Sequence, residues 1–233
     1  HVRAIAQTAG DFSNNKDMID TIVFDLDGTL LNTLDDLMDS VNYALGTFGF
    51  PARTYDEVRR FVGNGVRLLV ERALPDGEKQ HTDACLAVFS QHYDKNKTNK
   101  TRPYEGIPEM LTAIKAAGYK TAIVSNKYER AVQELAQTEF AGRIDVAVGE
   151  RPGVQPKPAP DGVLTAIREL DVTRERCVYI GDSDVDVMTA KNAGLPMIGV
   201  SWGFRDRALL ERLGADIVVD EPAEIIRAVQ SIQ

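Results

Sequence analysis

The sequence predicts an α/β fold: a Rossmann-like, doubly wound parallel sheet that carries an inserted, all-helical domain. From residue 104 onward, short apolar runs alternate with amphipathic helical segments, which is typical of a parallel sheet covered by helices on both faces. Residues 34–103 show helical spacing of apolar side chains and no strand signal. An apolar run at 22–24 precedes them and should join the sheet as its first strand. We therefore expect a core, residues 18–33 and 104–233, and a helical insert, residues 34–103.

Bulk composition narrows the class of function. The 233 residues carry a net charge of −8, and no Lys- or Arg-rich run offsets it, which argues against a nucleic-acid partner. No apolar run approaches the ~18 residues of a membrane span, and no signal peptide is visible. The two cysteines, Cys85 and Cys177, are far apart and form neither a disulfide framework nor a zinc motif. We expect a cytoplasmic protein, a monomer or weak dimer without membrane association, whose partner is a small molecule.

The chain opens with a polar segment and continues into the helical insert. Residues 1–17 have no pattern, and Met18 stands just before the first strand, so we expect a flexible extension or the remnant of an expression tag. Thr33 to Asp36 fit a capping box, which would start a helix. Helices are expected at 34–48, 57–62, 66–74 and 84–93, followed by a polar, lysine-rich link at 94–102.

The second part of the core alternates helix and strand. A loop rich in Pro and Gly, residues 151–160, interrupts the alternation once. Strands are expected at 121–124, 145–148, 177–180, 197–200 and 217–219. Helices are expected at 110–116, 130–137, 162–170, 185–192, 209–213 and 223–231.

Two aspartates follow the first strand. Asp25 and Asp27 flank one leucine, and Gly28 then lets the backbone turn where most residues would be strained. Open α/β sheets bind their ligands at the carboxyl ends of their strands. Two carboxylates this close repel unless a cation or a proton separates them. All three histidines lie outside the polar motifs, so a metal here would bind oxygen, which favours Mg²⁺.

Three more polar segments lie in loops between predicted elements. They are Ser125-Asn126-Lys127, Gln155-Pro156-Lys157-Pro158 and Gly181-Asp182-Ser183-Asp184-Val185-Asp186. In a parallel sheet all of them converge with the first motif at one edge, and together they offer acids for a cation and a hydroxyl, an ammonium and helix N-termini for a phosphoryl group. Each also has a simpler interpretation: Ser125 as a helix cap, Lys157 as a solvated loop residue and Asp184 as a solvated acid.

The four motifs, in this order, resemble those of the haloacid dehalogenase superfamily of phosphatases, and the helical insert resembles the C1-type cap domain of that superfamily. The resemblance implies that Asp25 is the nucleophile, which forms an aspartyl phosphate. It implies that Asp27 protonates the leaving group and then deprotonates water. The implied phosphate-binding residues are Ser125, Asn126 and Lys157.

The resemblance also implies a Mg²⁺ site. Its implied ligands are Asp25, Asp27 through its backbone carbonyl, Asp182 and Asp186. For Asp186 three roles stay open: binding the ion directly, binding it through water, or orienting Lys157.

Within the insert, residues 61–74 resemble the segment of phosphoglycolate phosphatases that closes over the site. Gly63, Asn64 and Gly65 would let backbone N–H groups meet a small carboxylate, or they mark a helix break. Arg67 could assist them or pack its stem on the insert. The segment 202–205, Trp-Gly-Phe-Arg, follows a strand, and we favour packing over a place in the site for it.

The sequence thus predicts a Mg²⁺-dependent phosphomonoester hydrolase that acts on a small anionic metabolite, with 2-phosphoglycolate as the leading candidate. A phosphomutase of the β-phosphoglucomutase type could use the same core and cap, without net phosphate release. A pyrophosphatase or a sugar-phosphate phosphatase is the nearest alternative among hydrolases. A phospho-accepting binding module is opposed by Asp27, because an acid/base beside a phosphoaspartate hastens its loss.

Overall fold

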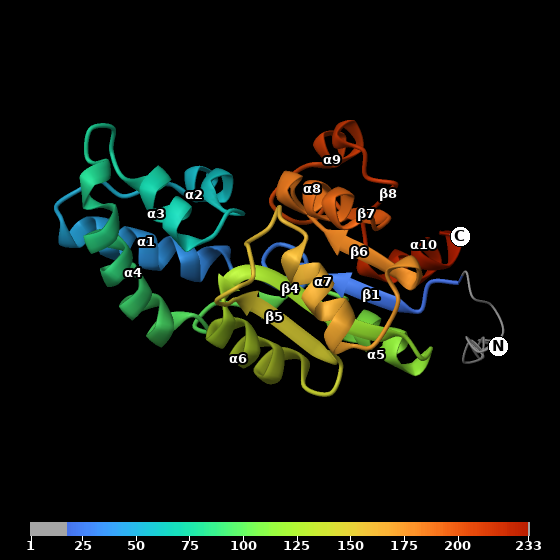
Figure 1. Cartoon of the computed structure of the whole chain (residues 1–233). Helices are drawn as coiled ribbons and strands as arrows, with labels where there is room; N and C mark the ends of the chain where they lie inside the picture. Colours follow the sequence, from blue (N-terminus) through green and yellow to red (C-terminus); the bar gives the residue numbers. More distant parts are fainter. Residues whose placement is uncertain (1–17, 233) are drawn as a thin grey trace, which may run out of the picture.

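The structure, a computed structural model, describes residues 18–232, so the prediction for residues 1–17 lies outside it. Its centre is a sheet of six parallel strands in the order β5-β4-β1-β6-β7-β8 (Figure 1). With the strands of the sheet counted in chain order, this is the 3-2-1-4-5-6 order of the Rossmann fold. The strands are β1 (Thr21–Phe24), β4 (Lys120–Tyr128), β5 (Val146–Glu150), β6 (Cys177–Gly181), β7 (Met197–Val200) and β8 (Ile217–Val219).

Strand β1 lies in the middle of the sheet and is buried along its whole length. Its four residues pair with β4 on one side and with β6 on the other. Because side chains alternate between the two faces of a strand, Ile22 and Phe24 enter one apolar cluster and Val23 enters the other. The sheet therefore needs helices on both faces, as the sequence predicted.

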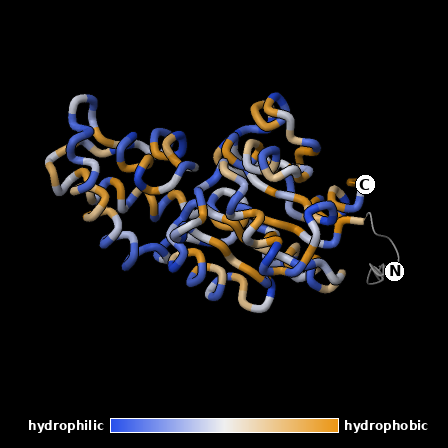
Figure 2. The backbone as a smooth tube through the Cα atoms, viewed as in Figure 1, coloured by the Kyte–Doolittle hydropathy of each residue, from blue (hydrophilic) through white to orange (hydrophobic). Residues whose placement is uncertain are grey.

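Within residues 18–232, six helices cover the sheet, three on each face. Helices α5 (Ile107–Ala116), α6 (Glu129–Phe140) and α10 (Ile225–Ser231) pack on the face of Ile22 and Phe24. Helices α7 (Asp161–Glu169), α8 (Asp184–Ala193) and α9 (Arg207–Leu213) pack on the face of Val23. Figure 2 shows the apolar residues gathered on the strands between these helices.

A separate group of helices, which we call the helical unit (residues 34–96), stands beside the carboxyl edge of the sheet (Figure 1). It has its own apolar cluster, to which all of its α-helices contribute. Its helices are α1 (Leu34–Thr47), α2 (Tyr55–Phe61), α3 (Val66–Ala73) and α4 (Thr82–Asn96). Two short antiparallel strands, β2 (Leu31–Asn32) and β3 (Arg102–Pro103), pair where the chain enters and leaves the unit.

Three local expectations were wrong. Residues 34–103 do contain a strand, since β3 lies at their end. Helix α4 reaches Asn96, so it takes up the first residues of the predicted link. No capping box forms at the start of α1: the Thr33 hydroxyl donates to Asp27 Oδ1 at 2.5 Å instead.

Asp36, the other half of the expected capping box, fastens the exit of the helical unit to its entry. Its side chain is buried and accepts hydrogen bonds from the backbone N–H groups of Lys100 and Thr101 and from the Thr101 hydroxyl, at 2.8–3.0 Å. Within the described residues, none of the helices combines the length and apolarity that crossing a membrane requires.

We predict that Asp36→Ala lowers the free energy of unfolding by about 2–3 kcal/mol, because it leaves buried donors without an acceptor. The matched control is Asp39→Ala on the same helix. Its carboxylate forms a half-exposed ion pair with Lys100 at 2.6 Å, and such pairs are worth less than about 1 kcal/mol. Urea unfolding of both variants measures the difference, and equal losses would contradict the role given to Asp36.

Candidate active site

The three central strands bring three of the predicted motifs together. Asp25 follows β1, Ser125 lies near the end of β4, and Asp182 follows β6. Because β4, β1 and β6 are adjacent and parallel, their carboxyl ends meet at one place. This place is the point where the strand order reverses, which is where open α/β sheets bind ligands.

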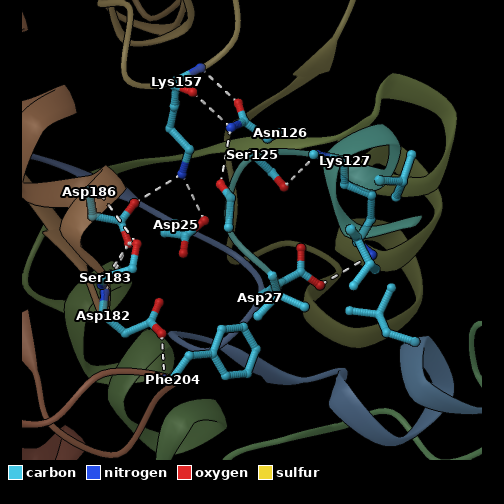
Figure 3. Close-up of a pocket in the computed structure, with 16 residues that line it drawn as sticks. Asp25, Asp27, Ser125, Asn126, Lys127, Lys157, Asp182, Ser183, Asp186 and Phe204 are labelled. Atoms are coloured by element: carbon cyan, nitrogen blue, oxygen red, sulfur yellow. Dashed lines mark hydrogen bonds and ion pairs between the residues drawn. The ribbon is translucent and has the colours of Figure 1, made fainter. Parts of the chain in front are cut away.

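Lys157 reaches this place from the loop between β5 and α7 (Figure 3). Its Nζ atom lies 2.9 Å from Asp25 Oδ1, 3.0 Å from Asp186 Oδ1 and 2.9 Å from the Tyr179 hydroxyl. Burial alone would lower the pKa of Lys157, but the carboxylates of Asp186 and Asp25 raise it well above its usual value. The side chain is therefore a fixed positive charge beside Asp25, which excludes the interpretation of Lys157 as a solvated loop residue.

Asn126 holds the loop of Lys157. Its side-chain amide donates to the Lys157 carbonyl at 2.9 Å, and its carbonyl oxygen accepts from the Lys157 N–H at 2.7 Å. The same amide donates to the carbonyl of Gly63 in the helical unit at 3.2 Å. The Asn126 side chain therefore links the core, the Lys157 loop and the helical unit.

Asp186 has hydrogen-bond donors on both carboxylate oxygens. Oδ1 accepts from Lys157 and, at 2.6 Å, from Tyr179. Oδ2 accepts from the N–H groups of Asp182 and Ser183 and from the Ser183 hydroxyl, at 3.0–3.1 Å. Burial opposes its charge, but Lys157 and Tyr179 hold the pKa of Asp186 below its usual value.

Asp182 is fully buried and is held at both oxygens. The Thr29 hydroxyl donates to Oδ1 at 2.9 Å, and the Phe204 N–H donates to Oδ2 at 2.7 Å. Burial, with repulsion from Asp186, raises the pKa of Asp182 to about 6.

Asp25, Asp182 and Asp186 form a cluster that suits a hard cation. Each is buried, and each offers a carboxylate oxygen within 4.8 Å of the others. Burial, and then repulsion from Asp186, raise the pKa of Asp25 well above its usual value. Three acids face one ammonium here, so the donor set fits a divalent ion with oxygen ligands.

The Asp27 side chain turns away from this cluster. Its Oδ1 atom accepts from Thr33 and lies 3.2 Å from Lys127 Nζ. Lys127 is buried, and its ammonium also donates to the Tyr93 hydroxyl at 2.5 Å. Burial lowers the pKa of Lys127, but Asp27 and Tyr93 outweigh burial and raise it above its usual value. The Ser125 hydroxyl accepts from the Lys127 N–H at 3.1 Å, so Ser125 does not cap a helix.

The helical unit supplies an apolar wall to the same pocket. The cavity has a volume of about 60 Å³, room for a few water molecules at roughly 10–15 Å³ each. Among the described residues, the helical unit contributes six to the lining of the cavity: Leu37, Val62, Gly63, Gly65, Val66 and Leu69. Asn64 and Arg67 lie elsewhere: the Asn64 side chain accepts from Arg72, and Arg67 pairs with Asp83 at the surface.

The segment 202–205 serves both roles that the sequence left open. Trp202 packs against the core and donates to the Thr29 carbonyl at 2.9 Å, as favoured. Phe204 lines the pocket. Arg205 donates to the carbonyls of Arg59 and Val62 in the helical unit at 3.2 and 3.3 Å, and Arg59 in return donates to the Gly203 carbonyl at 3.2 Å.

Comparison with known proteins agrees with this geometry. The family model of haloacid dehalogenase-like hydrolases matches residues 22–200. The chain belongs to this family. A phosphoglycolate phosphatase from Mesorhizobium japonicum is 38% identical to this hydrolase over 197 residues, 82% of this chain and 86% of that protein. A phosphoglycolate phosphatase from Aquifex aeolicus is 31% identical over 207 residues, 88% of this chain and 94% of that protein.

Solved structures are similar along most of the chain. One from Lactobacillus delbrueckii subsp. bulgaricus, provisionally named a phosphoglycolate phosphatase, has a TM-score of 0.88 at 34% identity and covers 92% of this chain and 99% of that chain. CbbY from Rhodobacter sphaeroides, solved in complex with phosphate, has a TM-score of 0.69 at 28% identity; the match covers 89% of this chain and 96% of that chain. Family and relatives together make this hydrolase a phosphatase.

Sequence reasoning missed three polar residues of the phosphatase site, Thr29, Thr33 and Tyr179. It placed Lys127 in a segment that reaches the site but assigned it no role. Tyr179 lies in an apolar strand, so the sequence indicates a core residue. Its ring does pack in the core, and its hydroxyl contacts Lys157. Lys127 follows Ser125 by two residues, and strand alternation could have placed both on one side.

Glycines let the backbone approach the buried acids. A Cβ atom on Gly203 would lie 2.2 Å from the Gly28 carbonyl and 2.4 Å from Asp182, and one on Gly28 would lie 2.3 Å from Asp182 Oδ2. Gly28 also has a φ of +87°, which disfavours any side chain. The turn after β1 and the segment after β7 therefore close tightly over Asp182.

We predict that Gly203→Ala in this phosphatase lowers the free energy of unfolding by about 1–3 kcal/mol through overpacking and weakens binding of a divalent cation, because it displaces Asp182. Gly46→Ala is the control: it lies in α1 with open space around it, and alanine there should raise stability by about 0.5–1 kcal/mol. Urea unfolding and calorimetric titration with Mg²⁺ measure both effects. If Gly203→Ala lowers the stability as expected but binds Mg²⁺ as tightly as the parent, Asp182 is not a ligand of the cation.

Proposed function

We propose that this phosphatase hydrolyses the phosphomonoester of a small anionic metabolite, with 2-phosphoglycolate as the leading candidate, through an aspartyl phosphate on Asp25. One observation carries the proposal: the ammonium of Lys157 lies 2.9 Å from Asp25 Oδ1 in a buried pocket. A carboxylate beside a fixed cation can receive a phosphoryl group whose own charge would otherwise repel it.

The reaction follows from the two aspartates. A carboxylate oxygen of Asp25 attacks phosphorus, the ester P–O bond breaks, and its electron pair stays on the leaving oxygen, which takes a proton from Asp27. Water then attacks phosphorus and gives its proton to Asp27, and the bond between Asp25 and phosphorus breaks. Inorganic phosphate leaves, and both carboxylates return to their starting state.

The other polar residues bind the phosphate and the ion. We assign Ser125 and Lys157 to phosphate oxygens, and Asn126 to holding the Lys157 loop, on the hydrogen bonds given above. The proposed ion is Mg²⁺, held by Asp25, Asp182 and the Asp27 carbonyl; when bound, it offsets charge between the nucleophile and the phosphate dianion. Of the roles open for Asp186 we propose orientation of Lys157, because two donors on its Oδ1 and three on its Oδ2 use up the lone pairs of the carboxylate, whereas each oxygen of Asp182 accepts from one donor.

The lining of the pocket supports a phosphorylated metabolite as substrate. An apolar wall from the helical unit faces a polar floor from the core. A phosphomutase, which must let a sugar phosphate turn over in the site, is the second candidate. The helical unit is then the cap domain that closes over the substrate, with Gly63 and Gly65 beside it and Asn64 outside the lining. A cytoplasmic location and a monomer or weak dimer belong to the same proposal.

We predict that Asp25→Asn lowers kcat by roughly 10⁴-fold or more, as loss of a catalytic nucleophile does, while far-UV circular dichroism and cooperative unfolding stay those of the parent. The matched control is Asp76→Asn, which changes an acid on an exposed turn of the helical unit and should leave kcat unchanged. Parent-like turnover by Asp25→Asn would refute the nucleophile.

A substrate panel tests the specificity. We expect phosphate release from 2-phosphoglycolate to exceed that from glucose 6-phosphate and pyrophosphate, and EDTA to abolish it until Mg²⁺ is added back. Conversion of glucose 1-phosphate without phosphate release would favour the phosphomutase. Equal, slow release from the whole panel would reduce the proposal to an unspecific phosphatase.

A further inference from the structure

Lys127 occupies an unusual position for a residue without an assigned role in the reaction. Its side chain is 3% exposed and lies in the pocket wall, two residues beyond Ser125. Among the described residues that line the pocket, Lys157 and Lys127 are the two cations. Lys157 faces Asp25 and Asp186, whereas Lys127 faces Asp27.

The two carboxylate oxygens of Asp27 have different surroundings, because Lys127 contacts only one of them. Oδ1 lies 3.2 Å from the Lys127 ammonium and accepts from Thr33. Within residues 18–232, the structure gives Oδ2 no hydrogen-bond donor. Figure 3 shows a dashed line from one Asp27 oxygen to Lys127 and none on the other oxygen. Lys127 and Thr33 therefore fix the carboxylate so that one oxygen stays available.

Tyr93 fixes Lys127 in turn. Its hydroxyl lies 2.5 Å from the Lys127 ammonium, and the ammonium lies 4.5 Å from the centre of the tyrosine ring. Tyr93 is buried in α4 and stacks on Phe89 at 5.5 Å. The ammonium thus has one partner in each unit, Asp27 in the core and Tyr93 in the helical unit, and cannot swing away without losing both.

We propose that Lys127 is a positioning residue for proton transfer, which aims Oδ2 of Asp27 at the leaving oxygen and stabilises the carboxylate that remains. The inference rests on the proposed function. In the first step the ester P–O bond breaks, its electron pair goes to the leaving oxygen, and the proton moves from Asp27 to that oxygen. The Lys127 charge lies beside the aspartate at the moment it becomes an anion, so the transfer gains a fixed counterion.

The leaving group separates this role from others. Ethyl phosphate releases an alkoxide, which needs the proton, whereas acetyl phosphate releases acetate, which does not. The variant Lys127→Met keeps the stem and removes the charge. We expect it to slow first-turnover release of ethanol about 10²-fold, at the low end of the range for general acid catalysis, and release of acetate less than about 10-fold. Rapid-quench measurement of the first turnover excludes the later hydrolysis step.

Two further variants complete the test. Tyr93→Phe removes only the hydroxyl that holds Lys127. We expect it to slow the first turnover less than Lys127→Met does, and again to slow ethyl phosphate more than acetyl phosphate. This variant provides the test if Lys127→Met does not fold. Lys95→Met, on the exposed side of the same helix, should change neither rate.

Two results would overturn the proposal. Equal losses on ethyl and acetyl phosphate would give Lys127 a structural or phosphate-binding role. A rise in KM confined to 2-phosphoglycolate, with ethyl phosphate unaffected, would make Lys127 a receptor for the substrate carboxylate. Failure of the proposed function looks different, because the unaltered enzyme would then release neither alcohol nor acetate.

Discussion

Buried like charge is the constraint on which this structure depends. Asp25, Asp182 and Asp186 place carboxylate oxygens within 4.8 Å of one another, away from solvent. Such a group costs several kcal/mol unless positive charge and hydrogen bonds offset it. The ammonium of Lys157, the hydroxyls of Thr29 and Tyr179 and several backbone N–H groups supply that compensation. Burying Asp25 also removes the water that would otherwise solvate its carboxylate and compete with the phosphate for contact with it.

The sheet makes this arrangement possible. Parallel pairing of β1 with both β4 and β6 brings three strand ends together. Glycines at 28 and 203 then allow main chain to lie against Asp182. The fold therefore fixes the acids, and Lys157 enters from a loop that Asn126 holds by two hydrogen bonds.

The sequence was most informative where a local pattern decides the structure. Alternating apolar runs predicted the parallel sheet, and polar residues after strands predicted which motifs meet. It was least informative where a distant partner decides. Thr33 and Asp36 match a capping box locally, yet their side chains serve Asp27 and a backbone segment 64 residues away. Tyr179 follows the same rule, because a tyrosine in an apolar strand gives no sign of the buried partner that its hydroxyl will meet.

The contacts between Arg59, Arg205 and their acceptors have an evolutionary consequence. Each guanidinium donates across the boundary to main-chain carbonyls, at Gly203 and at positions 59 and 62. A carbonyl is present whatever side chain the position carries. The seam between the two units can therefore stay intact while Val62 and its neighbours mutate, so that selection can reshape the wall that meets the ligand without loosening the joint that brings it there.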